Sequence, residues 1–206
     1  MSVVFIGGSR RLSRLNSVIR GRLDNIMERK NAVIIGDANG GDRAVQAYLA
    51  ERGYRSVTVY CTNADCRNNV GRWPVRSVEA TNQRGFDYYA LKDAAMAADA
   101  ECGFMLWDGK SKGTLFNIRR LLAAGKPVVV YLAADHACHT IRHDAELAAL
   151  APPSTVATRQ QPADGNPAGQ GSLFPGARPE TLPGARAKPT SSSIPATRSA
   201  ARRSTP

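Results

Sequence analysis

The sequence predicts an α/β protein with a Rossmann-like three-layer fold, built on a parallel sheet of about five strands and followed by a disordered C-terminal tail. Short apolar runs rich in β-branched residues alternate with stretches in which apolar residues recur every three or four positions. From residue 151 onward, Pro, Ala, Gly, Ser, Thr and Arg dominate without any periodicity. Such a composition buries too little apolar surface to offset the entropy of folding.

Five apolar runs have the length and composition of buried parallel strands. Each is short, most are rich in Val, Ile or Leu, and several stop at Gly or at a polar residue, as expected for strands covered on both faces. The runs cover residues 3–6, 32–35, 56–60, 103–107 and 127–132. Because helical patterns separate them, the strands are expected to be parallel, with right-handed crossovers.

Helical periodicity fills most of the stretches between these runs. We expect helices over residues 12–26, 42–53, 86–98, 115–125 and 134–150. Asp42 is interpreted as the N-cap of the second helix and Gly53 as its C-terminal stop. Residues 61–85 have no clear period, and we predict a long loop there.

The chain is therefore expected to divide into a Rossmann-like domain over residues 1–133, a C-terminal helix over 134–150 and a tail over 151–206. The tail carries seven basic side chains against two acidic ones, which gives +5 of the total formal charge of +11. A basic tail can contact nucleic acid weakly and without specificity, through counterion release. It can equally be a solubilising extension without a partner.

The cysteines and the apolar runs also indicate in which cellular compartment the protein is found. Four cysteines in a chain of 206 residues do not suggest a disulfide framework, and their spacing does not match a zinc site, so no metal and no cofactor is predicted. The first apolar run is too short for a signal peptide, and no stretch approaches a transmembrane helix. We therefore expect a cytoplasmic protein with reduced thiols and no membrane contact. A homodimer is compatible with the sheet type, although no interface is evident.

Three predicted strands end in glycine-rich loops, at the edge of the sheet where open parallel sheets bind ligands. The first loop holds Gly7, Gly8, Ser9 and Arg10. Adjacent glycines let a ligand approach the backbone, Ser9 can donate a hydrogen bond, and Arg10 can hold phosphate in a fork. The alternative is a tight turn with a solvated arginine.

The second and third loops carry more polar groups. In the second, Gly36, Asp37, Asn39 and Gly40 are candidate ligand-binding residues, and Asp37 is also a candidate catalytic carboxylate. In the third, the candidates are Lys110, Ser111, Gly113, Thr114 and Asn117, with the Gly113–Thr114 turn as phosphate seat at a helix start. The residue order differs from a Walker A loop, and the first loop lacks G-x-G-x-x-G, which disfavours an NAD-dependent dehydrogenase.

Three further residues are placed near the same crevice. Lys92 and Asp93 belong to a helix expected to pass it, and Asp93 is the second candidate catalytic residue; the alternative is a solvated pair on an exposed face. Trp107 ends a strand there and can stack on a base, or it can simply pack in the core.

The three loops, together with Lys92-Asp93-Ala94-Ala95-Met96 and Asp99, resemble the SLOG superfamily over roughly residues 2–133. The resemblance is to a branch of uncharacterised bacterial proteins related to the YspA-type domain. The same superfamily holds the "lonely guy" phosphoribohydrolases. It implies a phosphate seat at Gly113–Thr114 and a base or ribose near Gly7–Arg10 and Asp37. The phosphoribohydrolases carry a catalytic glutamate where this chain has Asn117.

The leading functional hypothesis is therefore a sensor or effector domain that binds a phosphorylated nucleotide or a nucleotide-derived ligand. The first alternative is an enzyme that hydrolyses or transfers at an N-glycosidic bond, with Asp37 or Asp93 in place of the missing glutamate. The second alternative is a nucleic-acid-associated protein that the basic tail tethers.

Overall fold

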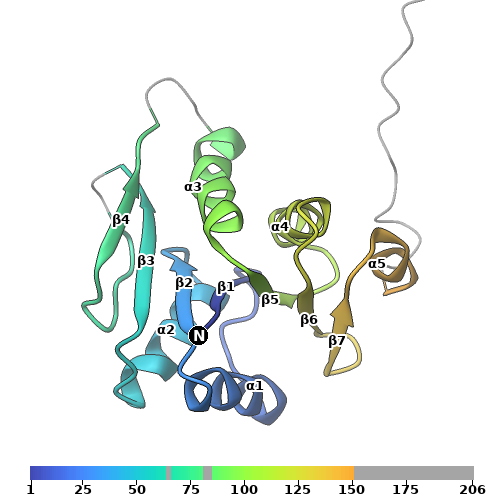
Figure 1. Cartoon of the computed structure of the whole chain (residues 1–206), viewed down its shortest axis with the longest axis horizontal. Helices are drawn as coiled ribbons and strands as arrows, with labels where there is room; N and C mark the ends of the chain where they lie inside the picture. The colour runs from blue at the N-terminus through green and yellow to red at the C-terminus, as the bar shows by residue number, and fades with distance from the viewer. Residues whose placement is uncertain (64–65, 81–84, 151–206) are drawn as a thin grey trace, which may run out of the picture. The chain divides into compact units, whose positions relative to one another are not determined.

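The computed structural model describes residues 1–63, 66–80 and 85–150, with the backbone alone at 85–87. A seven-stranded sheet runs through this part of the chain, with helices on both of its faces (Figure 1). The α/β class and the three layers are as predicted, but the sheet has two more strands than the expected five. The tail over residues 151–206 lies outside the described residues, so its contact with nucleic acid stays a prediction.

The strands are arranged in the order β4-β3-β2-β1-β5-β6-β7, and all neighbours are parallel except β6 and β7, which are antiparallel. Their bounds are β1 Val3–Gly8, β2 Ala32–Gly36, β3 Val57–Thr62, β4 Val75–Val78, β5 Cys102–Trp107, β6 Val128–Leu132 and β7 Ala137–Ile141. The helices are α1 Ser17–Glu28, α2 Gly41–Glu51, α3 Gly85–Asp99, α4 Lys112–Ala123 and α5 Asp144–Leu150. The chain leaves β1 toward β2 on one side and returns to β5 on the other, so the topological switch point lies between β1 and β5.

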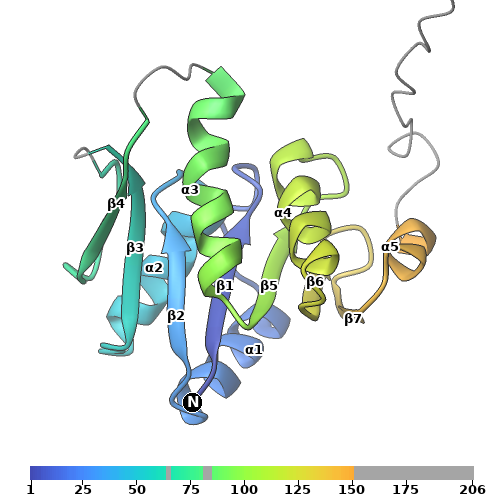
Figure 2. The same ribbon diagram turned by 45° about the horizontal axis from the view of Figure 1, so that its top comes forward.

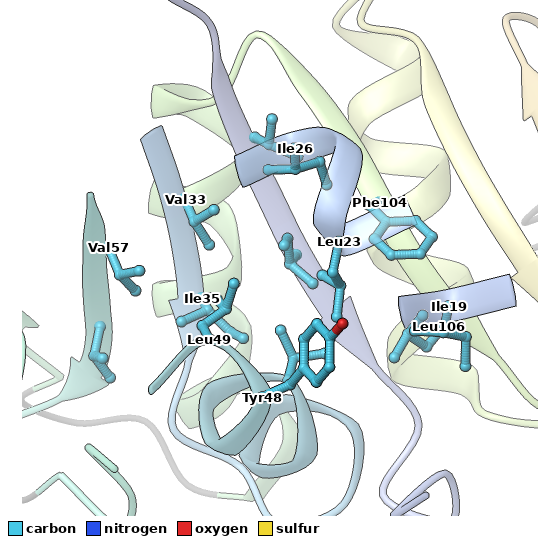
Figure 3. Packing of buried hydrophobic residues seen from close by; sticks show 14 of the residues in the cluster. Ile19, Leu23, Ile26, Val33, Ile35, Tyr48, Leu49, Val57, Phe104 and Leu106 are labelled. Carbon is cyan, nitrogen blue, oxygen red and sulfur yellow. The ribbon is translucent and has the colours of Figure 1, made fainter. Parts of the chain in front are cut away.

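Two hydrophobic clusters fix the helices on the sheet. On one face, α1 and α2 bury residues such as Leu23 and Leu49 against Ile35 of β2, as Figure 3 shows. On the other face lie α3 and α4 (Figure 2). These two helices bury residues such as Met96 and Ile118. The central strands are thus apolar on both sides, which explains why they were recognised as continuous apolar runs.

The first two helices begin at other residues than predicted. Helix α1 starts at Ser17 because the side chain of Asn16 accepts a hydrogen bond from the amide of Ile19 and caps it. Leu12 and Leu15 precede the helix and pack against the core from a loop. The N-cap of α2 is Gly40 and not Asp42, whose carboxylate is engaged elsewhere.

Strands β4 and β7 were missed because both are short and lie at the edges of the sheet. Most of β4 is exposed, and β7 carries polar residues, so neither forms a buried apolar run. The helix predicted over 134–150 is wrong in its first half, which contains β7; only α5 remains helical. The described residues of the connection from β3 to β4 form no helix. Trp73 packs into the core there, and its indole N–H donates to the carbonyl of Tyr54.

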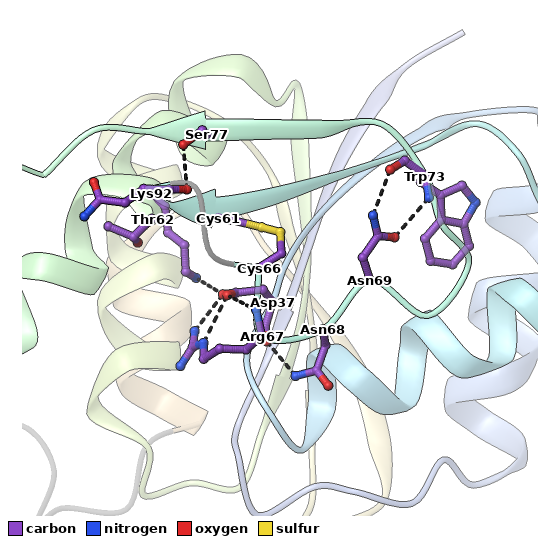
Figure 4. Close-up of a disulfide and its surroundings, with 12 residues drawn as sticks. Asp37, Cys61, Thr62, Cys66, Arg67, Asn68, Asn69, Trp73, Ser77 and Lys92 are labelled. Atoms are coloured by element: carbon purple, nitrogen blue, oxygen red, sulfur yellow. Dashed lines mark hydrogen bonds and ion pairs between the residues drawn. A yellow bond between two sulfur atoms is a disulfide. The ribbon is translucent and has the colours of Figure 1, made fainter. Parts of the chain in front are cut away.

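The structure joins Cys61 and Cys66 in a disulfide (Figure 4). The expectation of reduced thiols is therefore wrong for this pair, while Cys102 and Cys138 are free. Within the described part of the chain, no helix combines the length and the apolar character needed to cross a bilayer. The same residues contain no group of three or more His, Cys, Asp or Glu side chains that could hold a metal ion.

Candidate functional site

A cavity of about 580 Å³ lies at the carboxyl ends of β1 and β5, at the switch point of the sheet. Its volume is in the range of small-molecule sites. Eleven of the candidate residues line it: Gly7, Gly8, Ser9, Arg10, Lys92, Asp93, Lys110, Ser111, Gly113, Thr114 and Asn117. The remaining five candidates lie outside the lining: Gly36, Asp37, Asn39, Gly40 and Trp107.

The first loop is tied to the third through Ser9. This residue is 2% exposed, and its hydroxyl donates to Oδ2 of Asp108 at 2.9 Å, while its amide donates to the carbonyl of Leu106. Oδ1 of Asp108 accepts from the amides of Lys110 and Ser111. Burial alone raises the pKa of Asp108, but these hydrogen bonds outweigh it and lower the pKa. Ser9 therefore holds two walls of the cavity together.

The glycines of the second loop approach the first loop closely. Gly40 has a φ of 85°, and a Cβ atom there would collide with the backbone of Arg10. Gly41 lies against Gly8, and its amide donates to the carbonyl of Ser9 at 3.0 Å. The close approach predicted for these glycines thus occurs between two loops of the protein itself.

Asp42 is buried between the same two loops and is hydrogen-bonded to both of them. Its carboxylate accepts from the amide of Gly8 at 3.1 Å and from the amide of Ala38 at 3.3 Å. Burial raises the pKa of Asp42 to about 6, although the charge of Lys92 and the two hydrogen bonds oppose the shift. The carboxylate that was predicted to cap α2 instead fixes the floor of the cavity.

Asp37, a candidate catalytic residue, is 2% exposed and paired with Arg67. Two nitrogens of the guanidinium reach its carboxylate, at 2.6 and 3.0 Å, and the amide of Arg67 donates to it as well (Figure 4). Burial alone raises the pKa of Asp37, but the hydrogen bonds from Arg67 and the charge of Lys92 outweigh it and lower the pKa. Asn39 is exposed and accepts a hydrogen bond from Asn68.

Lys92 lies at the centre of a group of carboxylates. Its ammonium is 3.1 Å from Asp93 and 3.8 Å from Asp37. Burial alone lowers the pKa of Lys92, but the charges of Asp93 and Asp42 outweigh it and raise the pKa, so the ammonium stays protonated. Gly36 lies beneath this group: a Cβ atom there would come within 2.9 Å of the Lys92 nitrogen and within 2.6 Å of Asp42 Oδ2.

The third loop has the predicted geometry of a helix start. Ser111 caps α4, its hydroxyl oxygen accepting from both the amide and the hydroxyl of Thr114. The first N–H groups of the helix have no partner within it, and they form the positive end of the helix dipole. Trp107 is fully buried and its indole N–H donates to the carbonyl of Ser111, so the structure gives it a packing role and no face for a base.

Asn117 and Asp93 meet at the cavity wall. The amide nitrogen of Asn117 donates to Asp93 Oδ2 at 3.1 Å. Asn117 is 8% exposed, and its Oδ1 has no hydrogen-bond partner within the described residues. Of the two candidate catalytic carboxylates, Asp93 is the one that lines the cavity.

Several lining residues were missing from the sequence-based prediction. Arg67 comes from the loop after the disulfide, and its guanidinium lies 4.7 Å from the ring centre of Tyr89, which is 43% exposed. Neither lies in a glycine-rich loop, so no local pattern marked them. Arg11 and Lys112 also line the cavity and adjoin predicted residues.

No protein-family model matches the sequence, and no curated protein matches it either. A similar solved structure is that of DNA processing protein A from Helicobacter pylori, described by its single-stranded DNA binding mode. It is 15% identical with a TM-score of 0.48, and the alignment covers 63% of this chain and 64% of that one. The chain thus spans slightly less than two thirds of that protein. The fold and the cavity define a Rossmann-like α/β protein with a cavity at the switch point of its sheet.

Proposed function

We propose that the cavity binds a phosphorylated nucleotide or a nucleotide-derived ligand, and that the protein acts as a sensor or effector domain. The observation that carries the proposal is the lining of the cavity, which combines exposed cations in the first and third loops with the acceptors of Asp93 and Asn117. A sugar phosphate needs both kinds of group. The resemblance of the loops to the SLOG superfamily favours the same ligand class.

Four exposed cations in the cavity lining are evidence for a phosphate site at Gly113 and Thr114. Arg10, Arg11, Lys110 and Lys112 all line the cavity and are exposed. Among the described residues, none of these four side chains forms an ion pair with a carboxylate. Unpaired cations beside the N-terminus of a helix favour an anion there.

The partners of the two candidate catalytic carboxylates bear on the enzymatic alternative. Asp93 lines the cavity but is engaged by Lys92 and Asn117, and Asp37 is engaged by Arg67. A general base must reach the proton that it removes, and its pKa must be near the working pH. This arrangement supports binding over N-glycosidic cleavage.

Isothermal titration calorimetry with AMP, ADP-ribose and NAD tests the proposal. We expect binding in the micromolar range, weakened at least tenfold when Lys110 and Lys112 are both changed to Ala. The control is Arg55→Ala, which removes an exposed cation far along the chain from the three loops and outside the cavity lining. If none of the three compounds binds, or if both variants weaken binding equally, the proposed function is wrong. Release of free base or nicotinamide, abolished in Asp93→Asn, would instead establish the enzyme.

A further inference from the structure

Asn117 lines the cavity, and only half of its side-chain amide has a hydrogen-bond partner among the described residues. Its nitrogen is used by Asp93, whereas Oδ1 has no partner within the described residues although the side chain is almost completely buried. A buried acceptor without a partner is unfavourable, because it has lost its hydrogen bonds to water. Thr62 holds the other such oxygen, but it does not line the cavity. At Asn117, a ligand can supply the missing donor.

The position of Asn117 on α4 indicates which part of the ligand it meets. Asn117 follows Thr114 by three residues, so the two side chains share one face of the helix, about 4.5 Å apart along its axis. If a phosphate lies at the helix start, the group beside Asn117 is the one attached next to the phosphate. In a nucleotide 5′-phosphate this is the sugar, since the base lies beyond it.

We propose that Asn117 and Asp93 select a ligand whose sugar carries vicinal hydroxyl groups, that is, a ribonucleotide over its 2′-deoxy counterpart. The 2′-hydroxyl donates to Oδ1 of Asn117 and the 3′-hydroxyl to the carboxylate of Asp93, which is 20% exposed and lines the cavity. Since Oδ1 is buried in the structure, this bond requires the side chain of Asn117 to turn toward the cavity. The inference rests on the proposed function.

The test compares the affinities of the protein for AMP and 2′-deoxy-AMP. A site built around a hydroxyl rejects the analogue that lacks it, because its own polar groups then stay unpaired. We expect the wild-type protein to prefer AMP at least tenfold. Asn117→Leu, similar in size but without an acceptor, should bring the ratio of the two affinities close to one, because the 2′-hydroxyl then has no acceptor there.

Thr62→Val is the matched control, because it removes the second unpaired buried oxygen from a position outside the cavity lining. Its preference for AMP should equal that of the wild type. Circular dichroism checks that each variant is folded, and Asn117→Ala replaces Asn117→Leu should the larger side chain not be accommodated. Equal binding of both nucleotides by the wild type, or an unchanged ratio in the Asn117 variant, overturns this inference and leaves the proposed function standing. Absence of any nucleotide binding overturns both.

Discussion

Arg67 holds the carboxylate of Asp37 at two points, from a position five residues beyond the end of β3. Asp37 is almost completely buried, whereas Arg67 is partly exposed and also stacks on Tyr89 at the cavity. The pair therefore connects the buried charges of Asp37 and Lys92, at the carboxyl end of β2, with the cavity. Its removal should affect stability more than the loss of a surface ion pair would.

Arg67→Met is expected to lower the free energy of unfolding by about 1–3 kcal/mol, because Asp37 keeps Lys92 as its remaining cationic neighbour, at 3.8 Å. The control is Arg76→Met, which breaks an exposed pair with Asp99 and should cost under about 1 kcal/mol. Because the pKa of Asp37 is lowered in the folded protein, its contribution is present above the unfolded pKa and is lost as the pH falls. Urea denaturation at several pH values measures both effects; equal losses in the two variants would contradict the assignment.

Asp42 should give stability the opposite pH dependence. Its folded pKa of about 6 lies above the ordinary value of 3.8, so between these values the folded protein holds a proton that the unfolded chain has lost. The free energy of unfolding then falls as the pH rises through this window, by up to about 3 kcal/mol. Asp42→Asn removes this component, and the difference between variant and wild type in urea denaturation from pH 4 to pH 7 isolates it. Parallel curves would show that Asp42 titrates normally.

Gly40→Ala should destabilise the protein by about 2 kcal/mol or more, since φ is positive there and the new Cβ would collide with the backbone of Arg10. Gly21 lies in α1 with nothing within 4 Å of its Cβ position, so Gly21→Ala should stabilise by about 0.5–1 kcal/mol. Thermal denaturation compares the two substitutions. A Gly40→Ala variant as stable as the wild type would mean that the loops do not meet as described.

Asp108→Ala should cost about 1–3 kcal/mol, because it leaves the hydroxyl of Ser9 and the amides of Lys110 and Ser111 without their acceptor. Asp108→Asn keeps one acceptor oxygen and should cost less. Nucleotide affinity should fall in the same order, since the residue positions two walls of the cavity. Chemical denaturation and calorimetry give the two measurements, and full affinity in the alanine variant would argue against this role.

The disulfide gives a direct chemical prediction. In protein denatured without reductant, an alkylating agent should label Cys102 and Cys138 and leave Cys61 and Cys66 unlabelled until a reductant is added. Mass spectrometry of the peptides reads the labels. Labelling of all four cysteines before reduction would restore the sequence-based expectation of free thiols.

The sequence sufficed for the features that depend on local composition. The central strands were found because both of their faces are buried, and the helix start at Ser111–Thr114 because glycine, hydroxyls and a following apolar pattern coincide there. The pairing of Asp37 with Arg67 was not predictable, since it joins residues 30 positions apart through a stretch without period. The role of Gly40 was predicted only in kind: close approach was expected, but the partner is Arg10 and not a ligand.

The two tryptophans of the chain lie in different hydrophobic clusters, Trp73 with α1 and α2, and Trp107 with α3 and α4. The molecule therefore carries one intrinsic fluorophore on each side of its sheet. In the single-tryptophan variants Trp73→Phe and Trp107→Phe, emission would report separately on the two layers during unfolding. Coincident transitions would mean that the two layers unfold as one cooperative unit. Separate transitions would show which helical layer unfolds first.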